Sequence, residues 1–394
     1  MKRSLYFQIQ NQINHKNALI ICGMRQVGKT TLMQLVYHGI DQPKLWFDFE
    51  NPLDIMPFEA IDYNQIYFDL IKQASAKKGE PLFVFIDEIQ NYPDVTKIMK
   101  YLIDHYQVKF IVTGSSNYYM RNLFPESLSG RKFMYVLKPL SYSEFLYFNN
   151  AIPENEIDQD TLDNIFEKHS KYEYLKRNRF YDEYIEYGGF PEVALTPDME
   201  TKKLVLKNIF ASFFEKEIKL FSEFKDVREL RDLILLLAPR NGNMIDVTKL
   251  ASELGINRVK VYNYLEYLQG VFFLKLVPKY SKSIDKSVAA GKKVYFSDTG
   301  ILNLISKVTE GQLFETAVFN QLDVYGNVSF YNKRNSAEID FILNNEIALE
   351  VKVNTTQSDL TRLSKIAQSI GIQTTYIISR KHNDYEKSVF PQFI

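Results

Sequence analysis

The sequence predicts an α/β fold whose first part is a parallel β-sheet wound with helices. Two observations lead to this prediction. A glycine-rich segment at 23–31 stands between a strand-like apolar run at 18–22 and a helix-like run at 32–37. Beyond it, strand-like and helix-like runs continue to alternate. This alternation is typical of a doubly wound sheet, in which ligands bind at the carboxyl ends of the strands.

The elements of this sheet follow from the hydrophobic pattern. Continuous apolar runs favour strands that are buried on both faces, and apolar spacings of three and four residues favour helices. The further predicted strands are 45–50, 82–86, 109–116 and 133–137, and the predicted helices are 2–12, 32–37, 63–76 and 95–106. An acid-rich stretch at 151–170 is predicted to be a solvated excursion or lid.

The glycine-rich segment matches the pattern G-x-x-x-x-G-K-[ST] at every required position. Glycines let the backbone curl so that its N–H groups face a phosphate, and the following helix N-terminus adds partial positive charge. Lys29 is predicted to reach the β- and γ-phosphates, and the Thr30 hydroxyl to bind Mg²⁺. A chance glycine loop is the disfavoured alternative, because both flanking elements are present. The predicted nucleotide-binding residues of this loop are Gly23, Arg25, Gln26, Val27, Gly28, Lys29, Thr30 and Thr31.

A second motif is the apolar run at 82–86, which ends in Asp87 and Glu88. Asp87 is predicted to hold Mg²⁺ through its water shell, and Glu88 to polarise the water that attacks the γ-phosphate. Taken alone, the run would better suit an ordinary strand with acids at its exposed end. Together with the phosphate loop, the two acids predict hydrolysis, with ATP and Mg²⁺ as cofactors.

Two further positions are candidates for this site. In ATPases of this layout, a polar residue at the end of the strand predicted at 109–116 senses the γ-phosphate. Spacing leaves Ser115, Ser116 and Asn117 open, and Ser115 is counted among the nucleotide-binding residues. Arg131 either stabilises transition-state charge, in cis or across a subunit boundary, or is an ordinary surface arginine.

Composition narrows the class of protein. Lysine plus arginine equals aspartate plus glutamate at 48 each, so any contact with DNA must rest on local patches. Cys22 is the only cysteine, which excludes an internal disulfide and cysteine-based zinc sites. The N-terminus does not resemble a signal peptide, and no apolar run reaches membrane-spanning length. We therefore expect a cytoplasmic protein without a membrane partner.

Several short segments together resemble a known family, the prokaryotic AAA-type ATP-binding proteins that carry a C-terminal domain of unknown function. The segments that carry the resemblance are 23–31, 47–51, 85–90, 113–116, 129–131, 139–141 and 187–191. The resemblance extends over nearly the whole chain. It implies a P-loop ATPase joined to a winged-helix unit and to a restriction-endonuclease-like α/β unit.

Four segments are predicted on these grounds. They are a P-loop ATPase core at 1–145, a helical lid or linker at 146–200, a helical and winged-helix domain at 201–285, and a PD-(D/E)xK nuclease-like domain at 286–394. The glycines at 188–189 predict either tight backbone packing or a hinge, and an ordinary turn is equally open.

The segment from 246 to 276 has the cadence of a helix-turn-helix followed by a β-wing. A short helix at 248–254 and a longer one at 258–268 flank a turn at 255–257. Such a unit either contacts DNA or serves as a docking or lid module. The residues offered to a DNA groove are Asn257, Arg258, Lys260, Tyr262 and Asn263, and those offered to phosphates are Lys275, Lys279 and Lys282.

Near the C-terminus, a predicted hairpin pairs a strand at 338–343 with one at 347–353. Glu350 and Lys352 lie two apart on a strand and therefore face the same way, and Asp340 lies across the hairpin. Carboxylates that converge can hold a divalent cation, and a lysine can orient or deprotonate a water. Asp340 and Glu350 are thus predicted metal ligands, and both are catalytic candidates with Lys352. Glu315, from a preceding helix, is a further carboxylate candidate.

This pattern is similar to that of PD-(D/E)xK nucleases, although no proline precedes Asp340. The alternative is an edge hairpin with an ion pair between Glu350 and Lys352. The sequence therefore predicts an ATPase that couples nucleotide state to DNA binding or metal-dependent DNA cleavage. The second hypothesis is a nucleotide switch whose C-terminal half binds DNA or protein without cutting. The expected partners are ATP or ADP, DNA and, if Arg131 acts in trans, further copies of the chain.

Overall fold

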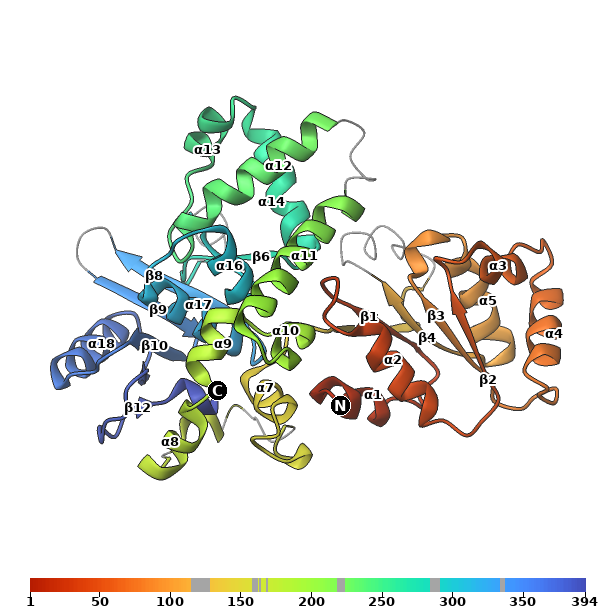
Figure 1. Ribbon diagram of the computed structural model, residues 1–394, viewed down its shortest axis with the longest axis horizontal. Helices are drawn as coiled ribbons and strands as arrows, with labels where there is room; N and C mark the ends of the chain where they lie inside the picture. The colour runs from red at the N-terminus through yellow and green to blue at the C-terminus, as the bar shows by residue number, and fades with distance from the viewer. Residues whose placement is uncertain are drawn as a thin grey trace. The chain divides into compact units, whose positions relative to one another are not determined.

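The computed structural model describes residues 1–114, 128–157, 162, 164–167, 169–217, 224–283, 291–333 and 337–394. Its helices and strands are labelled in Figure 1. The chain divides into two compact units, residues 1–138 with 270–272 and residues 139–269 with 273–394. No helix in the described ranges is both long enough and apolar enough to cross a bilayer.

The first unit is built on a five-stranded sheet of order β2-β3-β4-β1-β5. Every pair of neighbours in it is parallel, which confirms the predicted parallel sheet. Because β4 lies between β1 and β3, the phosphate loop and the two acids leave the sheet from strands that are not adjacent. The strands are β1 Ala18–Cys22, β2 Lys44–Asp48, β3 Phe83–Asp87, β4 Lys109–Gly114 and β5 Lys132–Val136.

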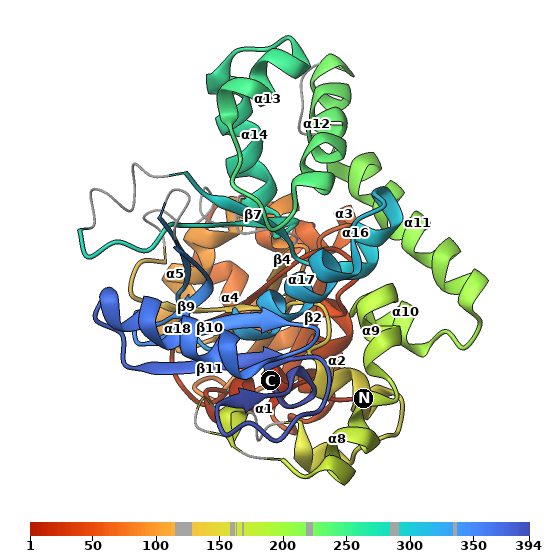
Figure 2. The ribbon, with the colours of Figure 1, turned by 90° about the vertical axis from the view of Figure 1, so that its left-hand side faces the viewer.

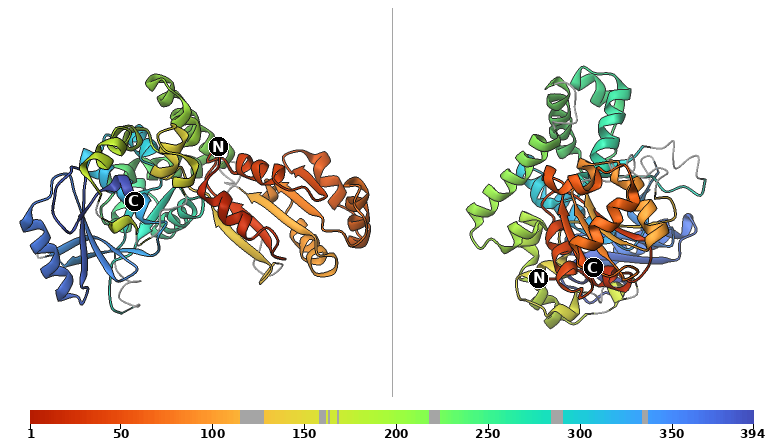
Figure 3. Two further views of the ribbon diagram at one scale, coloured as in Figure 1. Left: turned by 90° about the horizontal axis from the view of Figure 1, so that it is seen from below. Right: turned by 90° about the vertical axis from the view of Figure 1, so that its right-hand side faces the viewer.

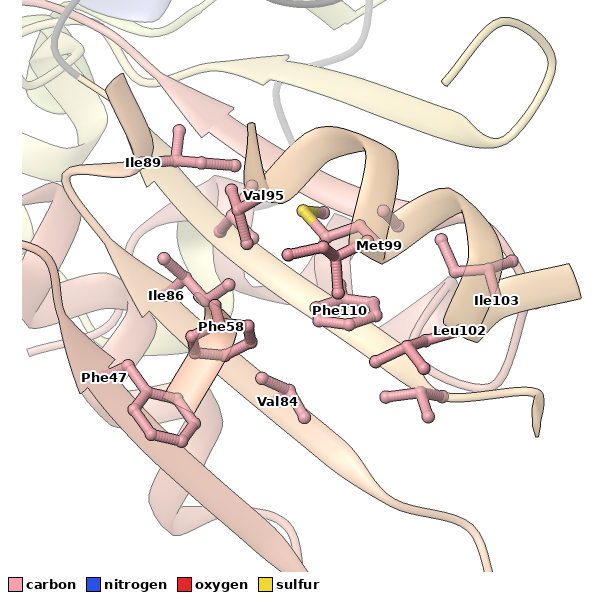
Figure 4. Packing of buried hydrophobic residues seen from close by; sticks show 14 of the residues in the cluster. Phe47, Phe58, Val84, Ile86, Ile89, Val95, Met99, Leu102, Ile103 and Phe110 are labelled. Carbon is pink, nitrogen blue, oxygen red and sulfur yellow. The ribbon is translucent and has the colours of Figure 1, made fainter. Parts of the chain in front are cut away.

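Helices surround this sheet, which Figure 3 shows from two further directions. They are α1 Ser4–Asn11, α2 Lys29–His38, α3 Pro52–Ile55, α4 Tyr63–Gln73 and α5 Val95–Tyr106. One face carries a large hydrophobic core made with α4 and α5. Figure 4 shows its sheet side chains Phe47, Val84, Ile86 and Phe110 against Val95, Met99, Leu102 and Ile103 of α5. These α5 positions recur at helical spacing and so lie on one stripe of the helix.

The second unit begins with helices. They are α7 Tyr142–Phe148, α8 Lys171–Asn178, α9 Tyr181–Tyr187, α10 Pro191–Leu195, α11 Met199–Glu217, α12 Phe224–Leu237, α13 Val247–Leu254 and α14 Arg258–Gly270. The chain then forms an antiparallel pair from β6, Leu274–Val277, and β7, Lys293–Phe296. Short 3₁₀ turns across the two units are Met56–Phe58, Ile89–Asn91, Glu154–Glu156, Asn164–Phe166, Ala238–Arg240 and Pro391–Phe393.

The C-terminal part of this unit holds a mixed sheet of order β12-β11-β10-β9-β8, whose strands β9, β10 and β11 are visible beside α18 in Figure 2. The β8–β9 and β9–β10 pairs are antiparallel, whereas β10–β11 and β11–β12 are parallel. The elements are α16 Thr299–Ile305, α17 Glu310–Leu322, β8 Val328–Lys333, β9 Ala337–Leu343, β10 Ile347–Lys352, α18 Gln357–Ser369, β11 Thr374–Ser379 and β12 Ser388–Val389. The predicted hairpin is therefore present as β9 and β10.

The predicted helix-turn-helix cadence is also present. Asp246 caps α13 by accepting the N–H groups of Thr248 and Lys249, and Gly255 ends the helix with a φ of 66°. Left-handed backbone at this position favours glycine, which has no Cβ. The helix α14 follows directly, and Met244 forms an isolated antiparallel bridge with Lys293 at the start of β7.

The two glycines at 188–189 lie in a tight contact within the second unit, which confirms the packing prediction over the ordinary turn. A Cβ on Gly188 would come within 2.3 Å of the Asp298 carboxylate, and one on Gly189 within 2.5 Å of the Leu140 carbonyl oxygen. Asp298 accepts the Gly189 N–H at 2.8 Å and the Ile301 N–H at 2.9 Å. Burial raises the pKa of Asp298 to about 6, although these hydrogen bonds favour the charged form.

Candidate nucleotide site and C-terminal carboxylate cluster

The phosphate loop connects the fully buried β1 to the N-terminus of α2. Gly23 has a φ of 156°, and a Cβ there would lie 2.1 Å from the Leu137 carbonyl oxygen. Gly28 caps α2 in a left-handed conformation with a φ of 93°. Both positions therefore require glycine, one for space and one for backbone conformation.

Lys29 is buried at the first position of α2. Its ammonium group donates hydrogen bonds to the carbonyl oxygens of Gly23 at 3.1 Å and Met24 at 2.8 Å. Burial lowers the pKa of Lys29, while the nearby carboxylate of Glu88 opposes this effect. The loop thus holds a cation against its own carbonyl groups, at the helix N-terminus where an anion is favoured.

Asp87 connects the phosphate loop to the end of β3. Its carboxylate accepts hydrogen bonds from the Thr30 hydroxyl at 2.7 Å, from the Thr113 hydroxyl, and from the Glu88 N–H at 3.1 Å. Two residues predicted from separate motifs, Thr30 and Asp87, are therefore in direct contact. A hydroxyl and a carboxylate are hard oxygen donors, so this pair suits Mg²⁺ that is shared with nucleotide phosphates.

Glu88 follows Asp87 in a left-handed backbone conformation, with a φ of 54° and a ψ of 48°. Its half-buried carboxylate accepts a hydrogen bond from the side-chain amide of Gln90. A non-glycine residue in this conformation carries a local energetic cost, which is often found at functional sites. Here it turns the chain sharply after β3, directly beside the Thr30–Asp87 pair.

The other predicted loop residues are spread over the same turn. Val27 is fully buried, Arg25 is half-buried, and Gln26 is exposed with a φ of 61°. Thr31 is exposed in the first turn of α2. The polar candidates Ser115, Ser116 and Asn117 lie outside the described residues.

Two residues of this site were missed by sequence reasoning. Thr113 is fully buried on β4, between β1 and β3, and its hydroxyl contacts Asp87. Arg3 precedes α1 and is also buried. Its guanidinium donates to the carbonyl oxygens of Val27 at 3.0 Å and Lys138 at 2.8 Å, so it ties the phosphate loop to the chain that follows β5. The strand order would have indicated Thr113, whereas no pattern in the sequence indicates Arg3.

Arg131 lies at the opposite edge of the sheet from the phosphate loop. It immediately precedes β5, and its carbonyl oxygen accepts the N–H of Ala18, the first residue of β1. Its guanidinium pairs with Asp104 at 2.6 Å. Because the phosphate loop follows the last residue of β1, the structure does not bring Arg131 next to the phosphate loop of its own chain. A role in trans stays a prediction.

The C-terminal hairpin brings Asp340, Glu350 and Lys352 together. Asp340 accepts the Val351 N–H at 2.9 Å, and the Lys352 ammonium pairs with the Glu350 carboxylate at 2.9 Å. Arg362 of α18 pairs with the same carboxylate oxygen, Oε1. Burial raises the pKa of Glu350, and the Asp340 carboxylate acts in the same direction while Lys352 opposes it. The predicted constellation and the predicted ion pair are therefore both present.

Glu315 of α17 joins this group, as the sequence indicated. It accepts a hydrogen bond from the Tyr295 hydroxyl of β7, and the Lys293 ammonium lies 3.9 Å from it. Burial and the neighbouring Asp340 carboxylate raise the pKa of Glu315 to about 7. Lys293 also pairs with Glu338 at 3.0 Å. We name the four acids Glu315, Glu338, Asp340 and Glu350 the carboxylate cluster.

Two acids of this cluster, Asp340 and Glu350, offer oxygen atoms of the kind that hard divalent cations prefer. Oxygen Oε2 of Glu350 is buried and has no hydrogen-bond partner among the described residues. Among those residues, no group of three or more histidine, cysteine, aspartate or glutamate side chains could hold a metal ion. Mg²⁺ is commonly bound by only one or two carboxylates together with substrate phosphates, so Asp340 and Glu350 would suffice to hold it.

The helix α14 offers less charge than its sequence indicated. Lys260 pairs with Asp226 at 2.6 Å and Glu229 at 2.5 Å, both on α12. Lys275 of β6 pairs with Asp323. These two lysines are therefore paired with acids of their own unit. The exposed face of α14 retains Arg258, Val259, Tyr262, Asn263 and Glu266.

Three segments of the chain match known protein families. Residues 15–146 match the family described as AAA domain (AAA_14). Residues 178–312 and 310–392 match two families described as domains of unknown function, DUF8612 and DUF4143. The first unit is therefore an α/β domain with a P-loop NTPase core, and a further α/β region with a mixed sheet follows it.

Similar proteins extend over most of the chain. "Uncharacterized protein MJ1544" of Methanocaldococcus jannaschii is 27% identical over 82% of this chain and 71% of its own length. An "Uncharacterized protein" of Haemophilus influenzae is also 27% identical, over 86% of this chain and 84% of its own. Among solved structures, the Walker-type ATPase PABY2304 of Pyrococcus abyssi is similar over 77% of this chain and 94% of its own. Its sequence identity is 14% and its TM-score 0.48.

Proposed function

We propose that this protein binds and hydrolyses ATP with Mg²⁺. The observation that carries the proposal is the hydrogen bond of Thr30 to Asp87, since it joins the helix after the phosphate loop to the acid that ends β3. Lys29 would contact the β- and γ-phosphates, Thr30 and Asp87 would hold Mg²⁺, and Glu88 would accept a proton from the attacking water. The match of residues 15–146 to an AAA domain supports these roles.

Replacing Lys29 with alanine tests this proposal. The change removes a charged donor to the phosphates, and such a contact is worth about 1.5–3 kcal/mol, so ATP affinity should fall by roughly 10- to 150-fold. Steady-state ATP turnover and equilibrium binding of a fluorescent nucleotide measure the effect. Lys72→Ala, at an exposed position in the last turn of α4, is the matched control and should behave as wild type. Undiminished turnover of Lys29→Ala would contradict the proposed site.

We further propose that the second unit acts on DNA by metal-dependent cleavage. The supporting observation is that Asp340, Glu350 and Lys352 converge on one hairpin beside Glu315 of α17. Asp340 and Glu350 would hold the cation, and Lys352 would orient a water toward a phosphodiester bond. When bound, the metal supplies charge to the phosphate and lowers the pKa of its water.

A cleavage assay with Mg²⁺ or Mn²⁺ separates this proposal from a non-cleaving switch. Asp340→Ala and Lys352→Ala should each lower cleavage of plasmid DNA by at least about 100-fold, because the first removes a metal ligand and the second removes the group that orients the water. Asp384→Ala and Lys387→Ala, at exposed positions of the same unit, are the matched controls. If wild type cuts no DNA with either ATP or ADP present, the non-cleaving switch is favoured.

We propose that the chain after the ATPase core is divided into a lid or linker at 146–200, a helical and winged-helix domain at 201–285, and a nuclease-like domain at 286–394. The order α12, bridge at Met244, α13, α14, β6 and β7 supports the winged helix. With Lys260 and Lys275 in internal ion pairs, a DNA contact would rest on Arg258, Tyr262 and Asn263. Nucleotide state would then reposition the second unit.

A further inference from the structure

One lysine of the antiparallel pair β6–β7 lies beside the carboxylates of the proposed cleavage site. Lys293 is the first residue of β7, and its side chain is only 7% exposed. Its ammonium lies 3.0 Å from Glu338 and 3.9 Å from Glu315, and 5.2 Å from the ring centre of Phe330. Lys293, which lies on β7, therefore contacts one carboxylate on β9 and one on α17.

Two residues of β7, Lys293 and Tyr295, contact the carboxylate of Glu315. Lys293 and Tyr295 are two residues apart on the strand and therefore point to the same side. Both approach the same oxygen, Oε1 of Glu315, one by charge and one by a hydrogen bond. This shared target makes the placement of Lys293 a feature of the cluster rather than an incidental surface pair.

The cluster is close to neutral without any bound ion. Its four carboxylates face three side-chain cations, of which Lys352 and Arg362 pair with Glu350 and Lys293 pairs with Glu338 and Glu315. Burial would lower the pKa of Lys293, but Glu315, Asp340 and Glu338 outweigh it and the pKa is raised. Lys293 is therefore charged, and its ammonium group lies beside the carboxylates of Glu338 and Glu315.

We propose that Lys293 is a tethered counter-ion of the carboxylate cluster, whose charge opposes the binding of a divalent cation to Asp340 and Glu350. The proposal rests on the proposed metal-dependent function of this cluster. The Lys293 ammonium and the Asp340 carboxylate interact through their charges, so a divalent cation bound to Asp340 would be repelled by Lys293. In this partly buried cluster, water screens the repulsion less than at an open surface. The protein thus tunes its own metal affinity with a residue carried on β7, outside the hairpin that carries Asp340, Glu350 and Lys352.

The test measures Mn²⁺ binding by the full-length, nucleotide-free protein, with free Mn²⁺ followed by electron paramagnetic resonance. The component that Asp340→Asn removes defines the C-terminal site. For that component, Lys293→Met should lower the Kd for Mn²⁺ by at least about tenfold, in line with the effect of one adjacent charge on an ionisable group. Lys293→Arg, which keeps the charge, and Lys307→Met, at an exposed position of the same unit, should match wild type.

Thermal unfolding gives a second readout. Without metal, Lys293→Met should unfold at a lower temperature than wild type, because the carboxylates lose a counter-ion. Added Mn²⁺ should raise the unfolding temperature of this variant more than that of wild type. If Lys293→Met does not fold alone, it should fold when Mn²⁺ is present from the start. A lysine with a purely structural role would lower the unfolding temperature and leave the response to Mn²⁺ unchanged, which would overturn the proposal.

The outcomes distinguish failure of the counter-ion proposal for Lys293 from failure of the proposed metal site at Asp340 and Glu350. If Asp340-dependent binding exists and Lys293→Met shows wild-type or weaker affinity, the counter-ion proposal is wrong and the metal site stands. If neither wild type nor Lys293→Met shows any Asp340-dependent binding, the metal site is wrong, and the counter-ion proposal falls with it.

Discussion

Replacing Glu88 with glutamine is expected to lower ATP turnover by about 10²- to 10⁴-fold, the usual contribution of a general base. Glutamine has nearly the same shape as glutamate but cannot accept the proton of the attacking water. The Glu88 N–H donates to Asp87 from the backbone, so this contact survives the change. The Thr30–Asp87 hydrogen bond and the contacts of Lys29 to the loop do not involve the Glu88 side chain. ATP binding should therefore stay close to wild type.

Parallel measurement of turnover and of nucleotide affinity checks this expectation. Glu59→Gln, at an exposed position of the same unit, is the matched control and should change neither quantity. A variant that binds ATP normally and turns it over within about threefold of wild type would exclude Glu88 as the base. Loss of both turnover and binding would instead mean that the carboxylate, which accepts from Gln90, supports the loop structurally.

The core of the first unit could be read from the sequence because its signals are local. Strands buried on both faces carry long apolar runs, as at 18–22 in β1, 83–86 in β3 and 110–112 in β4. The phosphate loop has its own spacing, and the acids follow β3 directly. A parallel sheet then places the carboxyl ends of all strands at one edge, which brings Thr30 to Asp87 across 57 residues of sequence.

What the sequence left open in this unit depends on strand order and direction. Thr113 contacts Asp87 because β4 lies between β1 and β3, an order that no local pattern specifies. Arg131 comes shortly before the end of the unit, but it precedes β5 and so lies at the amino edge of a parallel sheet. Arg3 reaches the Val27 carbonyl only through tertiary packing. Each of these placements needs neighbours that are distant in sequence.

In the second unit, too, local features could be predicted from the sequence, whereas contacts between distant segments could not. The hairpin of β9 and β10 was predictable, because Asn344 and Asn345 tolerate the left-handed backbone of its turn, with φ values of 52° and 62°. The ion pairs around it were not. Lys260 looked available for DNA on its own helix, yet its partners come from α12. Lys293 lies 47 positions before Asp340 in the chain, and only the folded unit brings it into the carboxylate cluster.

Replacing Gly300 with alanine is expected to destabilise the second unit by about 3 kcal/mol or more, at the upper end of the usual cost of overpacking. A Cβ on Gly300 would lie 2.1 Å from the carbonyl oxygen and 2.4 Å from the carbonyl carbon of Tyr187. Both atoms belong to the backbone at the end of α9, so no side-chain rotation can relieve the clash.

Neither helix can move away freely. The N-terminal end of α16 is fixed to the chain around α9 by two hydrogen bonds, from the Gly189 N–H to Asp298 and from the Thr299 hydroxyl to the Tyr184 carbonyl. Separation of the two helices would break these contacts and leave the buried Asp298 carboxylate without one of its donors. Loss of a partner for a buried polar group adds about 1–3 kcal/mol to the cost.

Gly311 provides the matched control, because it is also a helical glycine of the same unit. A Cβ there would have the Thr309 hydroxyl as its nearest neighbour, at an ordinary contact distance of 3.9 Å. Gly311→Ala should therefore be neutral or stabilise by about 0.5–1 kcal/mol, the usual gain from glycine to alanine within a helix. Urea unfolding followed by circular dichroism measures both variants. If Gly300→Ala lies within about 1 kcal/mol of Gly311→Ala, the close approach of α16 to α9 is wrong, because a contact between backbones at 2.1 Å leaves no room for a methyl group.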